Sequence, residues 1–160
     1  VLKKCPVYLV KMPFNMAVFD HCRAAKVIAE YPDVNNWVIG GHSLGGAMAV
    51  HFLRENPHVF RGMFLWGAYP SRRDDVSEID IPMLTIFGSC DGITTVEKIE
   101  ASRGQFPPHA RWVKMEGGNH AQFGCYGSER KDNPAEISMD EQHCKVVEAT
   151  LGFLGEVCGE

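Results

Sequence analysis

The sequence predicts an α/β fold, a three-layer α/β/α sandwich in which helices cover both faces of a mainly parallel sheet of about five strands. Three observations predict it. Apolar runs of strand length recur along the chain, segments with the apolar spacing of a helix separate them, and 160 residues are enough for one such domain. Strands that alternate with helices pair in parallel and bury both faces of the sheet. We therefore expect a single domain over residues 1–160.

The strands are predicted from short runs that are rich in β-branched and aromatic residues. In chain order they span residues 6–10, 36–40, 63–66, 83–87 and 111–115. Pro6 opens the first run and Pro82 precedes the fourth, and a strand tolerates proline at its start. The polar residues 71–80 predict a loop between the third and fourth strands.

The helices are predicted from apolar residues that recur at spacings of three and four. They cover residues 15–30, 44–55, 94–103 and a last helix that begins after Ser138. Pro32 and Pro57 end the first two helices, and Ser138 with Glu141 forms the capping box of the last one. The residues expected to face inward are Val18, Cys22, Ala25 and Ala29 in the first helix and Val147, Leu151 and Leu154 in the last.

The composition excludes several classes of partner. The net charge is −4 and no basic stripe is visible, so neither a nucleic acid nor an anionic membrane surface is expected to bind. No apolar run approaches the ~20 residues that cross a membrane, and no signal peptide opens the chain. The six cysteines are scattered without a CxxC pair, so a metal site is not expected. We expect reduced, mostly buried thiols in a cytoplasmic protein.

Residues 40–46 (Gly-Gly-His-Ser-Leu-Gly-Gly) carry the G-x-S-x-G pattern of a nucleophile elbow, between the second strand and its helix. The serine backbone of such an elbow is strained, and a side chain at Gly41 or Gly45 is expected to collide with neighbouring backbone. The turn lifts Ser43 Oγ above the carboxyl end of the sheet, where open α/β sheets bind ligands. The Leu44 amide, at a helix N-terminus, can then bind an oxyanion. A glycine-rich turn with a purely structural role is the alternative.

A serine nucleophile needs a base and an orienting acid, and the topology requires both to follow strands. His120 follows the fifth predicted strand and Asp91 follows the fourth, which gives the chain order Ser43, Asp91, His120. Asp74 and Asp75 lie beside two arginines and are expected to form a solvated charge cluster. The histidines expected to have only packing or surface roles are His21, His42, His51, His58, His109 and His143.

Residues 41–46, 88–91 and 117–120 together resemble the α/β-hydrolase superfamily. Residues 12–15 and 120–124 are similar to its compact, lidless, bacterial esterase-like members. The resemblance covers about residues 7–154. It implies a minimal α/β-hydrolase fold and ester hydrolysis through an acyl-enzyme on a triad of Ser43, Asp91 and His120, without a metal or organic cofactor.

The family normally has further strands ahead of the elbow, and a loop after one of them donates the second amide of the oxyanion hole. No such loop is found upstream of Ser43. We expect residues 6–10 to lie as a strand beside the elbow strand and the loop after them to supply the Phe14 N–H, because Pro13 has none.

Residues 68–81 are too few for the cap domain that many lipases insert there, so the site is expected to be open to short, soluble esters. The apolar side chains expected to flank the substrate, although each suits packing equally well, are Met12, Phe14, Ile93, Phe123 and Tyr126. A thioesterase, a lactone hydrolase or an acyltransferase would use the same triad. A weakly active or non-catalytic fragment of the fold is a further alternative. An uncovered sheet edge also allows a homodimer.

Overall fold

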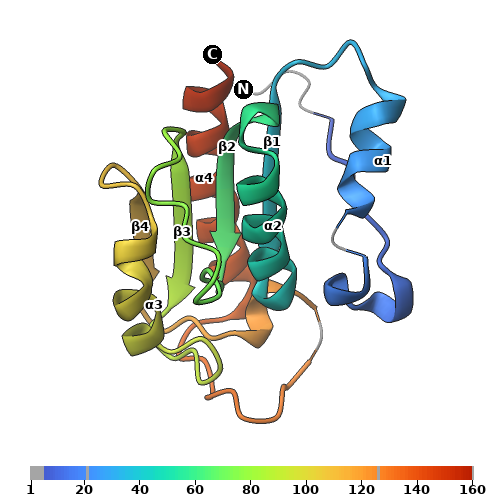
Figure 1. The fold of residues 1–160 in the computed structure, drawn as a ribbon. Coiled ribbons are helices and arrows are strands. Elements are labelled where there is room, and N and C mark those ends of the chain that lie inside the picture. Colours follow the sequence, from blue (N-terminus) through green and yellow to red (C-terminus); the bar gives the residue numbers. More distant parts are fainter. Residues whose placement is uncertain (1–5, 21, 126, 160) are drawn as a thin grey trace.

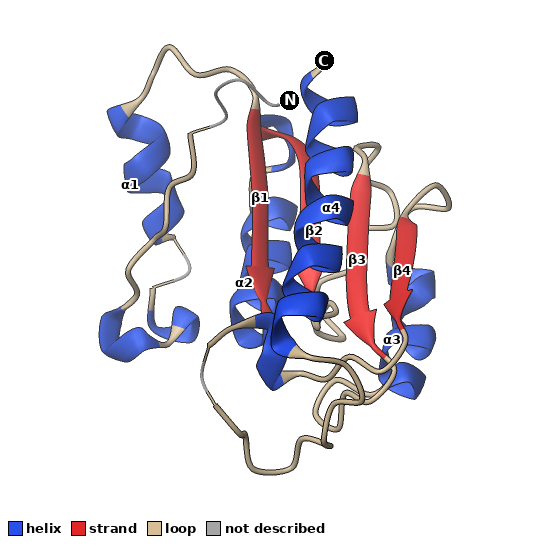
Figure 2. Cartoon of the chain, turned by 180° about the vertical axis from the view of Figure 1, so that it is seen from behind, coloured by secondary structure: helices blue, strands red, loops and turns tan. Residues whose placement is uncertain are grey.

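In a computed structural model, which describes residues 6–20, 22–125 and 127–159, the chain forms the expected α/β sandwich around a parallel sheet. Within these residues the sheet has four strands in the order β1-β2-β3-β4, and each strand runs parallel to its neighbours. The strands are β1 (Trp37–His42), β2 (Phe60–Trp66), β3 (Met83–Gly88) and β4 (Arg111–Met115). Because all four point the same way, their carboxyl ends meet at one edge (Figures 1 and 2).

Helices cover both faces of this sheet, which confirms the predicted fold class. Figures 1 and 2 show α2 (Ser43–Glu55) and α3 (Val96–Ser102) on one face and α4 (Met139–Cys158) on the other. α1 (Arg23–Glu30) lies beyond β1, where Ala24 and Ile28 pack against the core. The short 3₁₀ helices are η1 (Pro13–Asn15), η2 (Ala17–Phe19), η3 (Pro57–Val59), η4 (Arg103–Gln105) and η5 (Ala121–Phe123).

The core forms two clusters, one on each face of the sheet, because successive strand residues point to opposite faces. In β2, Met63 and Leu65 join the cluster that includes Leu53 of α2. In β3, Leu84 and Ile86 join the cluster that includes Phe153 of α4. Burial on both faces holds the strand ends rigidly, and the loops that follow them carry the candidate site.

The prediction of a strand over residues 6–10 is wrong, and the sheet accordingly has four strands rather than five. This segment is extended but unpaired, with Val7 and Leu9 at 86% and 97% exposure. Only one side of it meets the protein, where the Tyr8 ring packs on Tyr31 and on Trp37 at the start of β1. Aromatic contacts therefore hold this segment beside the sheet without the hydrogen bonds that would make it a strand.

The helix predicted over residues 15–30 is also interrupted. Two 3₁₀ turns precede it and the α-helix begins only at Arg23. Cys22, Ala25 and Ala29 are exposed, and the Val18 side chain lies outside the described residues. The inward pair, Ala24 and Ile28, is spaced by four, so the helical period was right and its phase was wrong.

The last helix has the predicted N-terminus but a different buried face. Ser138 Oγ accepts a hydrogen bond from Glu141 N at 3.2 Å, whereas the Glu141 carboxylate pairs with Lys145. Val147 and Leu151 are exposed rather than inward, and Leu154 is half-buried against the core. The buried residues are Gln142, Val146, Thr150 and Phe153. The apolar pattern could not identify this face, because two of its buried residues, Gln142 and Thr150, are polar and have hydrogen-bond partners. Thr150 Oγ1, for example, accepts a hydrogen bond from Trp66 Nε1 at 3.2 Å.

The described cysteines differ from the expectation of mostly buried thiols. Cys22, Cys125, Cys144 and Cys158 are exposed, and Cys90 is half-buried. Within the described residues, no helix combines the length and apolar character needed to span a membrane. The same residues hold no group of three or more acidic, histidine or cysteine side chains arranged to bind a metal ion.

Candidate active site

Ser43 occupies a strained turn at the carboxyl end of β1. It is the first residue of α2, and its φ of +52° lies in the left-handed region that non-glycine residues rarely adopt. Such strain costs on the order of 1–3 kcal/mol and persists only where the surrounding structure enforces it. The turn therefore has the geometry expected of a nucleophile elbow.

Two glycines allow the helix to start this close to the strand. A Cβ on Gly41 would lie 2.6 Å from the Gly45 carbonyl carbon, and one on Gly46 would lie 2.5 Å from Ala68 Cβ. Gly45, which the G-x-S-x-G pattern led us to expect as essential, has open space where its Cβ would be. Gly46 is the second required glycine because it faces Gly41 O and Ala68, whereas Gly45 faces away from the strand.

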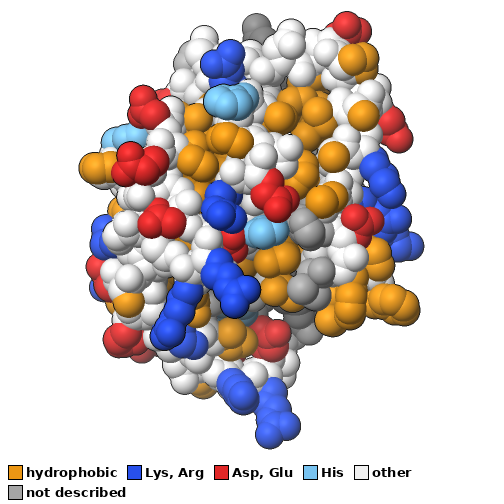
Figure 3. All heavy atoms as spheres, in the orientation of Figure 1, with side chains coloured by type: hydrophobic (Ala, Val, Ile, Leu, Met, Phe, Trp, Pro, Cys, Tyr) orange, Lys and Arg blue, Asp and Glu red, His pale blue; other side chains and the backbone are white. Residues whose placement is uncertain are grey.

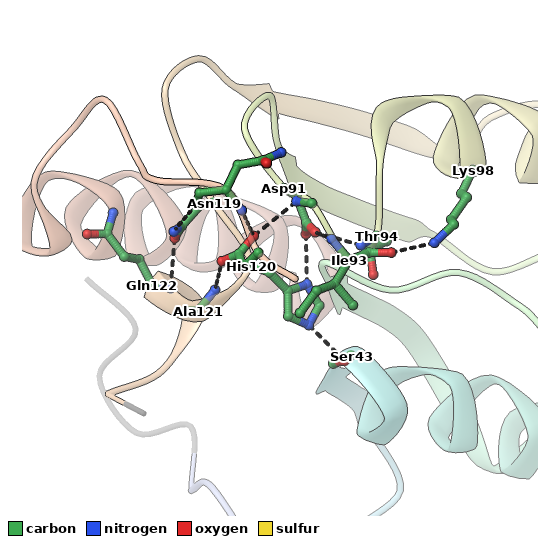
Figure 4. A network of polar contacts seen from close by, with 12 residues as sticks. Ser43, Asp91, Ile93, Thr94, Lys98, Asn119, His120, Ala121 and Gln122 are labelled. Carbon is green, nitrogen blue, oxygen red and sulfur yellow. Dashed lines mark hydrogen bonds and ion pairs between the residues drawn. The ribbon is translucent and has the colours of Figure 1, made fainter. Parts of the chain in front are cut away.

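Ser43, His120 and Asp91 form a continuous hydrogen-bonded chain (Figure 4). His120 Nε2 lies 2.8 Å from Ser43 Oγ, and His120 Nδ1 lies 2.7 Å from Asp91 Oδ2. His120 is 1% exposed and Asp91 3%. Since an ionised carboxylate only accepts, Nδ1–H donates to Asp91 and leaves Nε2 to accept the Ser43 proton. In this tautomer the imidazole is oriented as a base toward the hydroxyl.

The Asp91 carboxylate is held by its own loop. Asp91 Oδ1 accepts hydrogen bonds from Ile93 N at 2.9 Å and from Thr94 N at 2.6 Å, so Oδ2 faces the imidazole. Lys98 Nζ donates to Ile93 O at 2.6 Å and ties this loop to α3. Backbone donors thus fix the direction of the carboxylate before any substrate arrives (Figure 4).

The loop that carries His120 is fixed from α4. Gln142 is fully buried, and its side chain bonds both backbone groups of Asn119, accepting from Asn119 N at 3.1 Å and donating to Asn119 O at 2.8 Å. Gln122 N in turn donates to Asn119 Oδ1. Gln142 was missed in the sequence because a polar residue on a predicted helix reads as a surface position.

Gly67, which follows β2, was also missed. Its φ is +48°, and a Cβ there would lie 3.2 Å from both Asp91 Oδ2 and His120 Nδ1. The backbone at Gly67 therefore covers the Asp91–His120 hydrogen bond and leaves no room for a side chain. The sequence feature that could have identified Gly67 was a glycine directly after a predicted strand. All four strands accordingly contribute a residue to this site.

His42, expected to have a packing or surface role, packs directly against the base of the proposed chain of hydrogen bonds. Its ring packs 4.5 Å from the His120 ring and 5.5 Å from the Phe123 ring, measured between centroids. Burial, with a smaller contribution from His120, lowers the pKa of His42 to about 4. The imidazole is therefore neutral at pH 7, and it shields one face of the His120 ring from water.

The remaining predicted residues occupy varied environments. Leu44 lies in the first turn of α2, where amide N–H groups lack helical acceptors. Ile93 is half-buried beside Asp91, and Met12 is half-buried ahead of η1. Phe123 is buried in the core cluster next to α4, which favours its packing role. Tyr126 lies outside the described residues.

The strand that was expected to bring Phe14 beside the elbow does not form. Within the described residues β1 is an edge strand, so no strand lies on the far side of the elbow strand to lend a loop. Phe14 has a φ of +52° and is 88% exposed, with its ring packed edge-on against Phe19. The unpaired segment ahead of η1 lies beside β1 through Tyr8 but does not extend the sheet.

A second serine, aspartate and histidine cluster has a different order of contacts. Asp74 Oδ2 accepts from Ser71 Oγ at 2.6 Å, and Asp74 Oδ1 lies 2.8 Å from His51 Nδ1. Asp74 is buried, which corrects the expectation of a solvated charge. In these contacts the acid lies between the hydroxyl and the imidazole, and the cluster joins the loop after β2 to α2.

Comparison with known proteins shows which family and which solved structures this chain is similar to. A family model described as "Alpha/beta hydrolase family" matches residues 3–144. No curated protein sequence matches the chain. Among solved structures, a thermophilic esterase from Thermogutta terrifontis with malate bound matches with a TM-score of 0.64 at 16% identity, over 86% of this chain and 71% of that one.

Two further solved structures are similar in fold. A monoacylglycerol lipase from Paleococcus ferrophilus matches with a TM-score of 0.63 at 14% identity, over 86% of this chain and 76% of that one. A predicted CIB-like hydrolase from Thermoplasma acidophilum matches with a TM-score of 0.55 at 20% identity, over 82% of this chain. The present chain spans only 59% of the length of that hydrolase.

Adjacent glycines in the elbow provide a matched test of its packing. Gly46→Ala places a methyl group against Ala68 and Gly41 O, and we expect a loss of about 1–3 kcal/mol in the free energy of unfolding. Gly45→Ala meets open space within a helix and should be neutral or stabilising. Urea unfolding of both variants measures the difference. Equal stabilities would contradict the close approach of α2 to β1.

The buried His42 ring predicts a pH-dependent stability. The unfolded chain binds a proton at this histidine near pH 6.5, whereas the folded chain does so only near pH 4. Stability from this residue is complete above pH 6.5 and falls by up to about 2 kcal/mol between pH 6.5 and pH 5. His42→Phe should make the melting temperature less dependent on pH over this range. His58→Gln, at an exposed histidine, should keep the wild-type slope; identical slopes in all three proteins would refute the assignment.

Proposed function

Because this chain belongs to the alpha/beta hydrolase family, we propose that it hydrolyses carboxylic esters, with Ser43 as nucleophile, His120 as general base and Asp91 as the orienting acid. The observation that carries the proposal is the uninterrupted path from Ser43 Oγ through His120 to Asp91, with hydrogen bonds of 2.8 and 2.7 Å. A hydroxyl in direct contact with an oriented imidazole is the arrangement that serine acyl transfer needs.

The first half of the reaction forms an acyl-enzyme. His120 Nε2 takes the Ser43 proton as Oγ attacks the carbonyl carbon, and the Asp91 carboxylate supports the resulting imidazolium. The tetrahedral intermediate then collapses, and Nε2–H gives its proton to the departing alkoxide. The acyl group remains on Ser43 Oγ, and His120 is again neutral.

The second half uses the same groups with water. His120 Nε2 takes a proton from water, the hydroxide attacks the acyl carbon, and the second tetrahedral intermediate returns Ser43 Oγ with the proton from Nε2. The acid product leaves. Because Asp91 keeps its two backbone donors throughout, the imidazole has the same orientation in both halves.

The oxyanion of both intermediates is proposed to bind the Leu44 amide. This amide follows the nucleophile directly and belongs to the N-terminal turn of α2, where the helix dipole favours negative charge. The Phe14 N–H stays our proposal for the second donor. Loss of one such donor typically lowers the rate ~10²–10³-fold, so a single-donor site would be slow.

Short, soluble esters are the proposed substrates. The segment between β2 and β3 contains no helix, so no cap lies over the site from that side within the described residues. Met12 and Ile93, both half-buried, are the proposed contacts of a small acyl group, together with Tyr126. Thioesters and lactones present the same carbonyl chemistry and remain the alternative substrates. The cytoplasmic location expected from the sequence stays a prediction.

Labelling with a fluorophosphonate tests the nucleophile. We expect intact mass to show one adduct on the wild-type chain and none on Ser43→Ala, because only the serine beside His120 is activated. Ser128→Ala removes an exposed hydroxyl and should keep the adduct. A labelled Ser43→Ala, or an unlabelled wild-type chain, would reject the proposal in favour of the non-catalytic alternative.

Turnover of acetate and butyrate esters should also exceed that of long-chain triglyceride emulsions.

The exposed apolar residues beside β1 support the proposal of a homodimer. Figure 3 shows hydrophobic side chains gathered at the lower right, over the segment that holds η1 and η2 in Figure 1. Val7, Leu9, Phe14 and Phe19, which lie before and within this segment of the sequence, are all mostly exposed. Light scattering at high concentration should give the mass of a dimer for the wild-type chain. The Leu9→Lys variant should give a lower mass at the same concentration. A monomer at every concentration would count against this contact.

A further inference from the structure

A single carboxylate joins the loops that hold the proposed acid and base. Asp132 lies in the connection between η5 and α4, far in sequence from Asp91. Its Oδ1 accepts from Gly92 N and Asn133 N, each at 3.0 Å, and its Oδ2 accepts from Ala121 N at 2.8 Å. Gly92 directly follows Asp91 and Ala121 directly follows His120. Opposite oxygens of one side chain therefore hold the two loops at a set separation.

The loop around Asp132 is built for this approach. A Cβ on Gly92 would lie 2.5 Å from Lys131 O and 2.9 Å from Asn133 N, so only glycine permits the contact. Lys131, the preceding residue, has a φ of +80°, a conformation that non-glycine residues adopt at a cost. Asn119 Nδ2 donates to Asn133 O at 2.8 Å and binds the same loop to the residue before His120.

We infer that Asp132 is a positioning residue of the reaction, which holds the loops of Asp91 and His120 at the distance at which these two side chains hydrogen-bond. This inference rests on the proposed function of Ser43, His120 and Asp91. Asp132 touches no reacting atom. It acts through the backbone, and a displacement of about 1 Å in such groups can cost ~10²-fold in rate.

The other contacts between the two loops lie closer to the sheet. Cys90 N donates to Gly118 O at 2.8 Å, and Gly117 N donates to Ser89 Oγ at 2.8 Å. Both links precede the triad residues in their loops, whereas Asp132 joins the residues that follow them. Without Asp132, the loops stay attached at their bases but lose the contact that fixes their outer ends.

The charge of Asp132 also acts on a ring that packs against His120. It raises the pKa of His42, as the smallest of the contributions and against the larger effect of burial. Arg130 and Lys131 on the same loop are exposed to solvent, which screens their charges.

The test compares Asp132→Ala and Asp132→Asn with Glu129→Gln, a matched removal of one negative charge from an exposed position on the same loop. We expect Asp132→Ala to lower kcat on a soluble nitrophenyl ester ~10–100-fold with KM little changed. Asp132→Asn keeps one carbonyl acceptor, so it can hold only one of the two loops and should be intermediate. Glu129→Gln should match the wild type.

A spectroscopic measurement separates this inference from the proposed activity. In the wild type, ¹⁵N-edited spectra should show the His120 Nδ1 proton far downfield, assigned by its loss in His120→Gln. Asp132→Ala should broaden or shift this signal well below the melting temperature. An unchanged signal, or wild-type kcat in Asp132→Ala, would overturn the positioning role.

Failure of the proposed function and failure of the Asp132 inference give different results. A wild-type chain that neither hydrolyses esters nor takes the fluorophosphonate rejects the proposed function, while the Nδ1 signal still decides for or against Asp132. A lower melting temperature with unchanged kcat and unchanged signal would assign Asp132 a structural role only, against the inference. If Asp132→Ala does not fold, Asp132→Asn carries both measurements.

Discussion

The close approach of α2 to β1 is the constraint on which the rest of this structure depends. Gly41 and Gly46 remove the two side chains that would separate helix from strand, and the short turn between them leaves Ser43 in the left-handed region. Burial of β2 and β3 on both faces keeps the neighbouring strands from relaxing this strain. The hydroxyl is thereby presented above the sheet edge, 2.8 Å from His120 Nε2.

Parallel strands bring the other parts of the site to the same edge. Asp91 follows β3, His120 follows β4 and Gly67 follows β2, so each loop needs only a few residues to reach Ser43. Short loops alone do not orient side chains. Backbone donors orient Asp91, and the buried Gln142 of α4 holds the residue before His120. The helix on the far face of the sheet thus takes part in positioning the loop that carries His120.

Much of the fold follows from local pattern, and the deviations have physical causes. Four of the five predicted strands form, because each apolar run has a partner on both sides or a helix over each face. Residues 6–10 have the same composition as a strand but pack on the protein through side chains such as Tyr8, and they do not pair with β1 in a ladder of hydrogen bonds. The inward face of α4 was misjudged because Gln142 and Thr150 are buried through hydrogen bonds, which a count of apolar residues does not detect.

By itself, the sequence determined the α/β class and the order Ser43, Asp91, His120, since residues that follow parallel strands must meet at one sheet edge. Tertiary structure decided everything that depends on distance between loops. It showed that Gly46 rather than Gly45 is the close contact, that His42 packs on His120, and that Gly67 and Asp132 border the pair of Asp91 and His120. No local pattern encodes these contacts, because they join residues that only the folded sheet brings within a few ångströms of each other.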